Sequence, residues 1–174
     1  MSVRVLISFF CDDRPGVVEE LSAVVESSGG NWLDSQLSRL GGRFAGVLQV
    51  QVPKAHRDAL AEALLSLERA GITASITDAG DIDTQQTDLR CIRVLGPDRQ
   101  GIVHELTKAL READFNVRSL VTAVETAPMS GELLFRATAQ IEVEDPSKLA
   151  GLELELDKLA EQMTLEIDVL EDID

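Results

Sequence analysis

The chain has 174 residues, with 31 acidic against 16 basic side chains, a formal net charge of −15 and 3% aromatic residues. Such an acidic chain lacks the basic face with which proteins hold phosphate backbones, so direct binding of nucleic acid is not expected. An anionic membrane surface is disfavoured by the same sign of charge, and no apolar run approaches the roughly 20 residues that span a bilayer. The composition is still that of a folded protein, because 44% of the residues are hydrophobic and recur in regular patterns.

The first half of the chain predicts six elements. Residues 3–10 are a mostly apolar strand, and a helix with one apolar face begins after Pro15 and ends at Gly29–Gly30. Asp12 and Asp13 precede this helix and suit its N-cap or first turn. Two strands joined at Gly41–Gly42, a second helix and a fourth strand follow; they are predicted near residues 33–37, 44–52, 60–67 and 73–77.

The second half repeats this order of elements. Its strands are predicted at residues 88–95, 116–126, 135–143 and 165–169, and its helices at 102–110 and 149–159. Apolar and polar residues alternate along 135–143, which indicates a strand with one buried and one exposed face. The surplus of acid lies mainly here, with nine acids and one base from Gly151 onward. It is either a solubilising surface or a docking face for a basic partner.

An internal repeat explains the shared order. Residues 13–21, DRPGVVEEL, reappear 85 positions later as 98–106, DRQGIVHEL, with six of nine positions identical, and Asn31 falls on Asn116 at the same offset. We therefore predict two like domains at residues 1–80 and 88–174, joined by a linker at 81–87. The fold class is α+β: each half is a ferredoxin-like βαββαβ unit, a four-stranded antiparallel sheet with two helices on one face. The uncovered faces and edges of such sheets can be covered by the other half of the chain or by a second chain, and we expect a homo-oligomer.

The Asp-Arg-x-Gly turns at 13–16 and 98–101 are the main chemical signal. Each is predicted to join a first strand to a helix, whose free N–H groups and dipole favour an anion such as a carboxylate. Asn31 and Asn116 begin the next strand, whose start we expect near the turn, and an Asn can hold an amino or a carboxylate group. The same residues also have a purely structural interpretation, in which Asp caps a helix, Gly turns the chain and Asn starts a strand.

Catalytic motifs are missing from the sequence. It contains no G-x-S-x-G elbow, no phosphate-binding loop, no dinucleotide fingerprint and no repeated His, so we expect a protein that is not an enzyme and has no cofactor. Cys11 and Cys91 lack CxxC spacing and a neighbouring His, which argues against a disulfide framework or a metal site. The N-terminus shows no signal-peptide pattern, and together these features favour the reducing cytoplasm.

The segments FFCDDRPGVVEELSAVVESSGGNWLDSQL and RVLGPDRQGIVHELTKALREADFNVRSL resemble the first halves of ACT domains. Two tandem ACT domains resemble the glycine cleavage system transcriptional repressor family. The resemblance implies binding of a small amino acid, with glycine favoured, and regulation of transcription through a protein partner such as a transcriptional activator. The alternative is a detached regulatory or oligomerisation subunit of an amino-acid metabolic enzyme.

The resemblance also implies which residues bind the ligand. They are the residues of each turn and of the start of the following strand: Asp13, Arg14, Pro15, Gly16, Val17, Asn31, Trp32 and Leu33 in the first half, and Asp98, Arg99, Gln100, Gly101, Ile102, Asn116, Val117 and Arg118 in the second. The two sets differ at three equivalent positions, where the first half has Pro15, Trp32 and Leu33 and the second has Gln100, Val117 and Arg118. They therefore need not take the same ligand. Trp32 is also open to burial at an interface instead of contact with a ligand.

Overall fold

The computed structural model describes residues 1–80, 88–128 and 130–171 of the chain. The chain divides into two compact units, Met1–Asp83 and Thr84–Asp174. The predicted linker at 81–87 lies outside the described residues.

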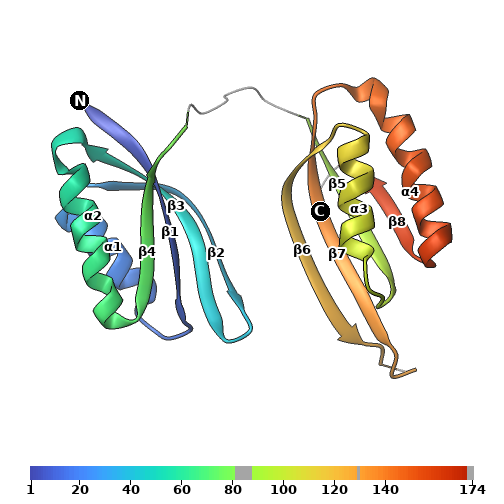
Figure 1. The fold of residues 1–174 in the computed structure, drawn as a ribbon, viewed down its shortest axis with the longest axis horizontal. Coiled ribbons are helices and arrows are strands. Elements are labelled where there is room, and N and C mark those ends of the chain that lie inside the picture. The colour runs from blue at the N-terminus through green and yellow to red at the C-terminus, as the bar shows by residue number, and fades with distance from the viewer. Residues whose placement is uncertain (81–87, 129, 172–174) are drawn as a thin grey trace. The chain divides into compact units, whose positions relative to one another are not determined.

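The first unit has the order βαββαβ (Figure 1). Its main elements are β1 (Ser2–Asp12), α1 (Val17–Ser27), β2 (Asn31–Leu40), β3 (Arg43–Pro53), α2 (Arg57–Ser66) and β4 (Ile72–Asp78), with short 3₁₀ turns η1 (Lys54–His56) and η2 (Leu67–Ala70) flanking α2. The strands form an antiparallel sheet in the order β2-β3-β1-β4. The predicted elements of this half are confirmed, although β2 begins two residues earlier than the predicted start near residue 33.

The second unit repeats this architecture. Its elements are β5 (Asp88–Pro97), α3 (Ile102–Glu112), β6 (Asn116–Thr126), β7 (Leu133–Val143), η3 (Pro146–Lys148), α4 (Leu149–Met163) and β8 (Glu166–Leu170). The sheet order, β6-β7-β5-β8, is that of the first unit. The α+β fold of two ferredoxin-like units is therefore confirmed.

Each unit buries one core between its sheet and its two helices. In the first unit, alternate residues of β1 and β3 meet the apolar faces of α1 and α2, represented by Ile7, Leu48, Leu21 and Leu64. In the second unit, Ile92 and Ile141 meet Leu106 and Leu152 in the same way. Because side chains alternate along a strand, the remaining residues of each strand point to an open face that no helix covers. Both helices lie on one side of each sheet, as Figure 1 shows.

Candidate ligand-binding turns

The turns after β1 and β5 share one backbone conformation. Gly16 and Gly101 are the N-caps of α1 and α3, with φ of 94° and 95°, a left-handed conformation that glycine adopts at little cost. The predicted capping by Asp12 or Asp13 is wrong, because the cap glycine has no side chain and the helix begins only at Val17.

Both helices expose N–H groups at this turn. The first intrahelical bonds are donated by the N–H of Glu20 to the Gly16 carbonyl and by the N–H of Glu105 to the Gly101 carbonyl, each at 2.9 Å. The N–H groups of the preceding residues have no acceptor in the helix, and the dipole places partial positive charge there. Each turn is therefore suited to an anionic group such as a carboxylate.

The tip of the β2–β3 hairpin packs against the first turn. The Asp13 N–H donates to the Gly42 carbonyl at 3.2 Å, and Arg39 forms an ion pair with Asp13 at 2.7 Å. Arg43 pairs with Asp12 at the end of the same hairpin. Neither Arg39 nor Arg43 belongs to the motif from which the site was predicted. The antiparallel pairing of β1 with β3 could have indicated them, since it brings the hairpin tip to the end of β1.

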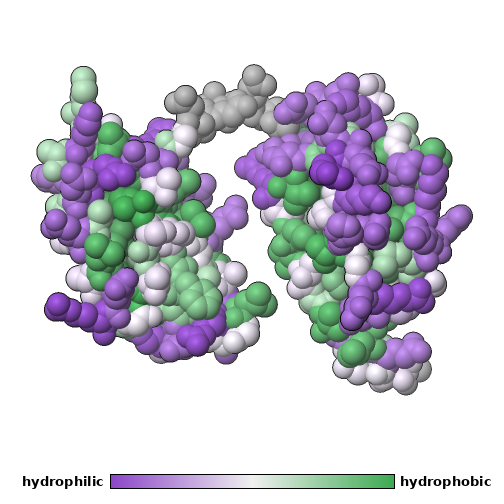
Figure 2. Space-filling view, in the orientation of Figure 1, coloured by the Kyte–Doolittle hydropathy of each residue, from purple (hydrophilic) through white to green (hydrophobic). Residues whose placement is uncertain are grey.

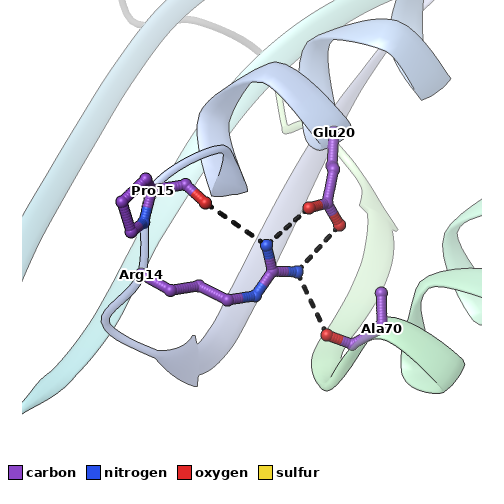
Figure 3. A network of polar contacts seen from close by, with 4 residues as sticks. All are labelled: Arg14, Pro15, Glu20 and Ala70. Carbon is purple, nitrogen blue, oxygen red and sulfur yellow. Dashed lines mark hydrogen bonds and ion pairs between the residues drawn. The ribbon is translucent and has the colours of Figure 1, made fainter.

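Arg14 is held within the first unit by several hydrogen bonds (Figure 3). Its Nη1 and Nη2 donate to the Glu20 carboxylate at 2.5 and 2.9 Å, and Nη2 also donates to the carbonyl of Ala70 at 3.1 Å. The hydrogen bond from Arg14 lowers the pKa of Glu20, and the same bond raises the pKa of the Arg14 guanidinium. Glu20 thus occupies the fork of donors that a ligand carboxylate would need.

A small hollow of about 250 Å³ lies at this first turn. Phe44 of the hairpin contributes to its wall, and the other lining residues belong to the turn and to the start of α1: Asp13, Arg14, Gly16, Val17, Val18 and Glu19. The structure thus brings four of the predicted residues, Asp13, Arg14, Gly16 and Val17, to one hollow.

The second turn lacks these internal ion pairs. Asp98, Arg99 and Gln100 are exposed, and within the described residues their side chains make no hydrogen bond or ion pair. Glu105 occupies the position of Glu20 but pairs with Lys108 at 3.9 Å. A Cβ atom built on Gly101 would meet nothing within 4 Å, whereas one on Gly16 would meet Glu20 and Arg14 at 3.7 and 3.9 Å. The second turn therefore presents a free carboxylate, a free guanidinium and open space.

The starts of β2 and β6 lie away from the turns. Asn31 pairs with Gln51 of β3, which pairs with Arg4 of β1, so Asn31 is level with the beginning of β1 and not with Asp12 at its end. Eight residues of strand separate the two levels, a span of about 26 Å. Asn116 is placed in the same way, level with Leu89. The expectation that the start of the second strand lies near the turn is wrong within either unit.

Other residues of the predicted site have structural contacts. Trp32 and Val117 pack against the cores of their units, and the side chains of Val17 and Ile102 are buried. Leu33 and Arg118 occupy equivalent bulges in β2 and β6. Asn116 donates to Glu142 at 2.8 Å, and Arg118 lies 3.9 Å from the same carboxylate. Pro15 is an exposed member of the first turn.

Cys11 lies next to the first turn but points into the core. Its thiol is buried and donates to the carbonyl of Phe44 at 3.6 Å, and burial raises its pKa. Because the thiolate is the reactive form, Cys11 has the properties of a packed thiol and not of an exposed sensor.

A larger hollow, of about 530 Å³, lies on the open face of the second sheet. Its charged lining residues are Arg93, Arg136, Glu125, Glu166 and Asp168, and Arg136 forms an ion pair with Glu125. This hollow is not among the predicted sites, although the alternation along β7 predicted an exposed face. The hollow has carboxylates beside its guanidiniums and no helix N-terminus, so it is less suited to an anion than the turns are.

Two further findings concern the described residues as a whole. They contain no group of three or more His, Cys, Asp or Glu side chains placed to hold a metal ion. None of the helices within residues 1–80, 88–128 and 130–171 has the length and apolar character needed to cross a membrane.

Comparison with known proteins agrees with the fold. The structure is similar to that of an unknown protein from Galdieria sulphuraria, with 26% sequence identity and a TM-score of 0.84. The similarity covers 99% of this chain and 100% of that protein's chain. It is also similar to a protein provisionally named as a glycine cleavage system transcriptional repressor, with 18% identity and a TM-score of 0.69 over 99% of both chains. No curated protein matches the sequence significantly.

The fold and the two glycine-capped turns define a tandem of ferredoxin-like domains with repeated turns suited to small anionic ligands. The sequence matches the ACT domain family over residues 4–77 and again over 91–170. The chain therefore belongs to the ACT domain family and contains two such domains.

Proposed function

We propose that this protein is a non-enzymatic regulator that responds to a small amino acid. The observation that carries the proposal is made at the second turn. There Asp98 and Arg99 have no side-chain partner among the described residues, and they lie beside the exposed N–H groups at the start of α3. An amino acid carries a carboxylate and an ammonium group on adjacent atoms. Its carboxylate fits Arg99 and the helix N–H groups, and its ammonium group fits Asp98.

The first turn has the same backbone conformation as the second, but its charged side chains are less available to a ligand. A ligand carboxylate that approaches Arg14 competes with Glu20, which is already bonded to both terminal nitrogens of the guanidinium. Displacement of Glu20 costs the free energy of that pair, so we expect the second turn to bind the amino acid more tightly. Membership of the ACT family, whose domains generally bind amino acids, supports the proposal.

The downstream step that we propose is regulation of transcription through a protein partner. With a net charge of −15, the chain is poorly suited to bind DNA itself, and its acidic surface favours a partner with a basic face. The structural relative with 18% identity is provisionally named as a transcriptional repressor of the glycine cleavage system, which supports that system as the target, and we propose glycine as the ligand. Affinity purification from the native cell, followed by mass spectrometry, would identify the partner and distinguish an activator from a metabolic enzyme.

Calorimetry with the twenty amino acids tests the first step. We expect one small amino acid to bind at micromolar to millimolar concentration, and Arg99→Ala to weaken its binding by at least about tenfold, since a charge-assisted hydrogen bond contributes about 1.5–3 kcal/mol. Arg14→Ala is the matched control and leaves the affinity of the second turn unchanged. Absence of binding by all twenty amino acids at millimolar concentration would contradict the proposal, as would equal binding by wild type and Arg99→Ala.

A further inference from the structure

The larger hollow, on the open face of the second sheet, has the size of a small-molecule site. Its volume of about 530 Å³ falls within the range of about 300–1,000 Å³ that is usual for such sites. The strand register places Leu95 between Arg136 of β7 and Glu166 of β8, so the lining residues of neighbouring strands adjoin. Figure 2 shows hydrophobic residues next to hydrophilic ones on the surface of the second unit, and the lining of the hollow has the same mixture. We call it the sheet hollow.

The negative charge of the sheet hollow is more available to a ligand than its positive charge. Arg136 is paired with Glu125, and Arg93 also has an interaction partner, so both guanidiniums are engaged. The side chains of Glu166 and Asp168, in contrast, make no hydrogen bond or ion pair within the part of the chain that the structure describes. A cation can therefore bind two carboxylates without displacing an existing pair, whereas an anion would have to compete for either guanidinium.

The two available carboxylates are spaced along one strand. Glu166 and Asp168 are alternate residues of β8, so they point to the same face and lie about 7 Å apart along the strand, while Ile167 between them packs on the core. Leu95 lies opposite Glu166 and is 40% exposed, and Leu134 of β7 is a further apolar part of the lining. The sheet hollow thus combines two acceptors of positive charge with an apolar wall.

The first sheet shows that the fold does not require these carboxylates. Through the strand register, Thr73 and Ser75 of β4 occupy the positions of Glu166 and Asp168 in β8. Ser75 shares a hydrogen bond of 2.7 Å with Ser8, so the first sheet has a neutral contact here. Two neighbouring carboxylates repel one another, which makes their presence in β8 unfavourable for folding alone. Binding of a cation would remove that repulsion.

We propose that the sheet hollow binds a linear aliphatic diamine, with one ammonium group at Glu166, the other at Asp168 and the alkyl chain along Leu95. A chain of about four to five carbons separates two ammonium groups by about the spacing of the carboxylates. Each ammonium group then donates charge-assisted hydrogen bonds to one carboxylate. An amino acid is less suited, because its own carboxylate would lie beside these two. This inference does not depend on amino-acid binding at the turns.

An NMR titration of the isotope-labelled full chain with putrescine, at constant ionic strength, tests the proposal. We expect saturable shifts of the backbone amide signals of β8 and of β5 around Leu95. The dissociation constant should be about millimolar, because exposed ion pairs are individually weak. Butylamine carries one ammonium group, as a lysine side chain does, and should bind about three- to fivefold more weakly than putrescine.

Glu166→Thr/Asp168→Ser installs the residues of the first sheet at the two positions. It should weaken putrescine binding by at least about tenfold, because the sheet hollow then keeps two guanidiniums and one carboxylate, Glu125. The matched control is Glu153→Gln/Asp157→Asn, which removes the same two charges from exposed positions of α4. This control should leave the affinity unchanged, and so should Arg99→Ala, which affects only the proposed amino-acid site. Far-UV circular dichroism checks that each variant is folded.

Three results would overturn the proposal. One is the absence of saturable shifts at about 20 mM putrescine, or shifts in the wild-type chain that lie outside the sheet hollow. Another is an equal loss of affinity in the two double variants, which would mean that putrescine responds only to the net charge of −15. The third is equal binding of butylamine and putrescine, which would exclude a role for the paired carboxylates.

Discussion

Arg14 donates two hydrogen bonds to Glu20, whereas the equivalent residues of the second unit, Arg99 and Glu105, are not paired with each other. The backbone of the two turns is the same, as the φ angles of Gly16 and Gly101 show. The two ACT domains therefore retain one scaffold and differ in which charges are available at it. Under the proposed function, the first turn acts mainly in stability and the second in ligand binding.

The Arg14–Glu20 pair predicts a pH-dependent contribution to stability. The pKa of Glu20 is lowered by Arg14, so the pair stabilises the native state above the ordinary glutamate pKa of about 4.3, and this contribution is lost as the pH falls through the lowered native pKa. Glu20→Gln should therefore lower the urea midpoint at pH 7, with a difference from wild type that narrows below about pH 4. Trp32, which packs on the first core, provides the fluorescence signal.

Glu105→Gln is the control for this experiment, because Glu105 has only a long contact with Lys108. Its urea midpoint should follow that of the wild type at every pH. A Glu20→Gln midpoint equal to wild type at pH 7 would show that the pair contributes nothing to stability.

The Glu20→Gln substitution should also change the ligand stoichiometry. Glu20→Gln removes the carboxylate that competes for Arg14 and leaves the Gly16 backbone in place. If the second turn binds an amino acid, the variant should bind a second equivalent, so that the calorimetric stoichiometry rises from about one to about two per chain. Glu20→Gln/Arg14→Ala should return to one. A stoichiometry of one in Glu20→Gln would restrict binding to the second turn for reasons other than competition by Glu20.

The sequence predicted the fold well because the fold depends on local patterns and on the repeat. Alternation along residues 135–143 marks β7, and the identities between residues 13–21 and 98–106 identify two copies of one unit. The helix start was less predictable. Asp13 is a good capping residue, but its carboxylate pairs with Arg39 from a hairpin that lies 26 positions further along the chain.

The candidate site was predicted only in part because its contacts are not local. Arg14 donates a hydrogen bond to the carbonyl of Ala70, and Phe44 lines the first hollow. Neither contact follows from the motif around Gly16. The prediction for Asn31 was wrong because the antiparallel register carries β2 along β3 and places its start at the end of the sheet away from the turn. Motif spacing identifies the turn, and sheet register is needed to identify its neighbours.

Two adjacent leucines on α2 should differ in how strongly their truncation destabilises the protein. Leu64 is buried between α2 and the first sheet, whereas Leu65 is 58% exposed. Leu64→Ala should lower the free energy of unfolding by about 2–5 kcal/mol, because it removes buried apolar surface and leaves a cavity. Leu65→Ala should change it by less than about 0.5 kcal/mol. Urea denaturation followed by Trp32 fluorescence measures both, and equal losses would contradict the burial of α2 in the structure.

Two glycines of the second unit should respond to alanine with opposite signs. A Cβ atom would meet nothing within 4 Å at either Gly101 or Gly151, so backbone conformation alone decides the outcome. Gly101 has φ of 95°, where an alanine is strained, and Gly101→Ala should lower the free energy of unfolding by about 1–2 kcal/mol. Gly151 lies within the helix α4, where alanine is favoured, and Gly151→Ala should raise it by about 0.5–1 kcal/mol.

Urea denaturation followed by far-UV circular dichroism distinguishes these outcomes, because α3 and α4 both contribute to the helical signal. Gly101→Ala also affects the proposed binding turn, since a change of its backbone would reorient the N–H groups that begin α3. Amino-acid binding should therefore weaken in Gly101→Ala and stay unchanged in Gly151→Ala. A Gly101→Ala variant as stable as the wild type would mean that the left-handed conformation at this turn is not required for the fold.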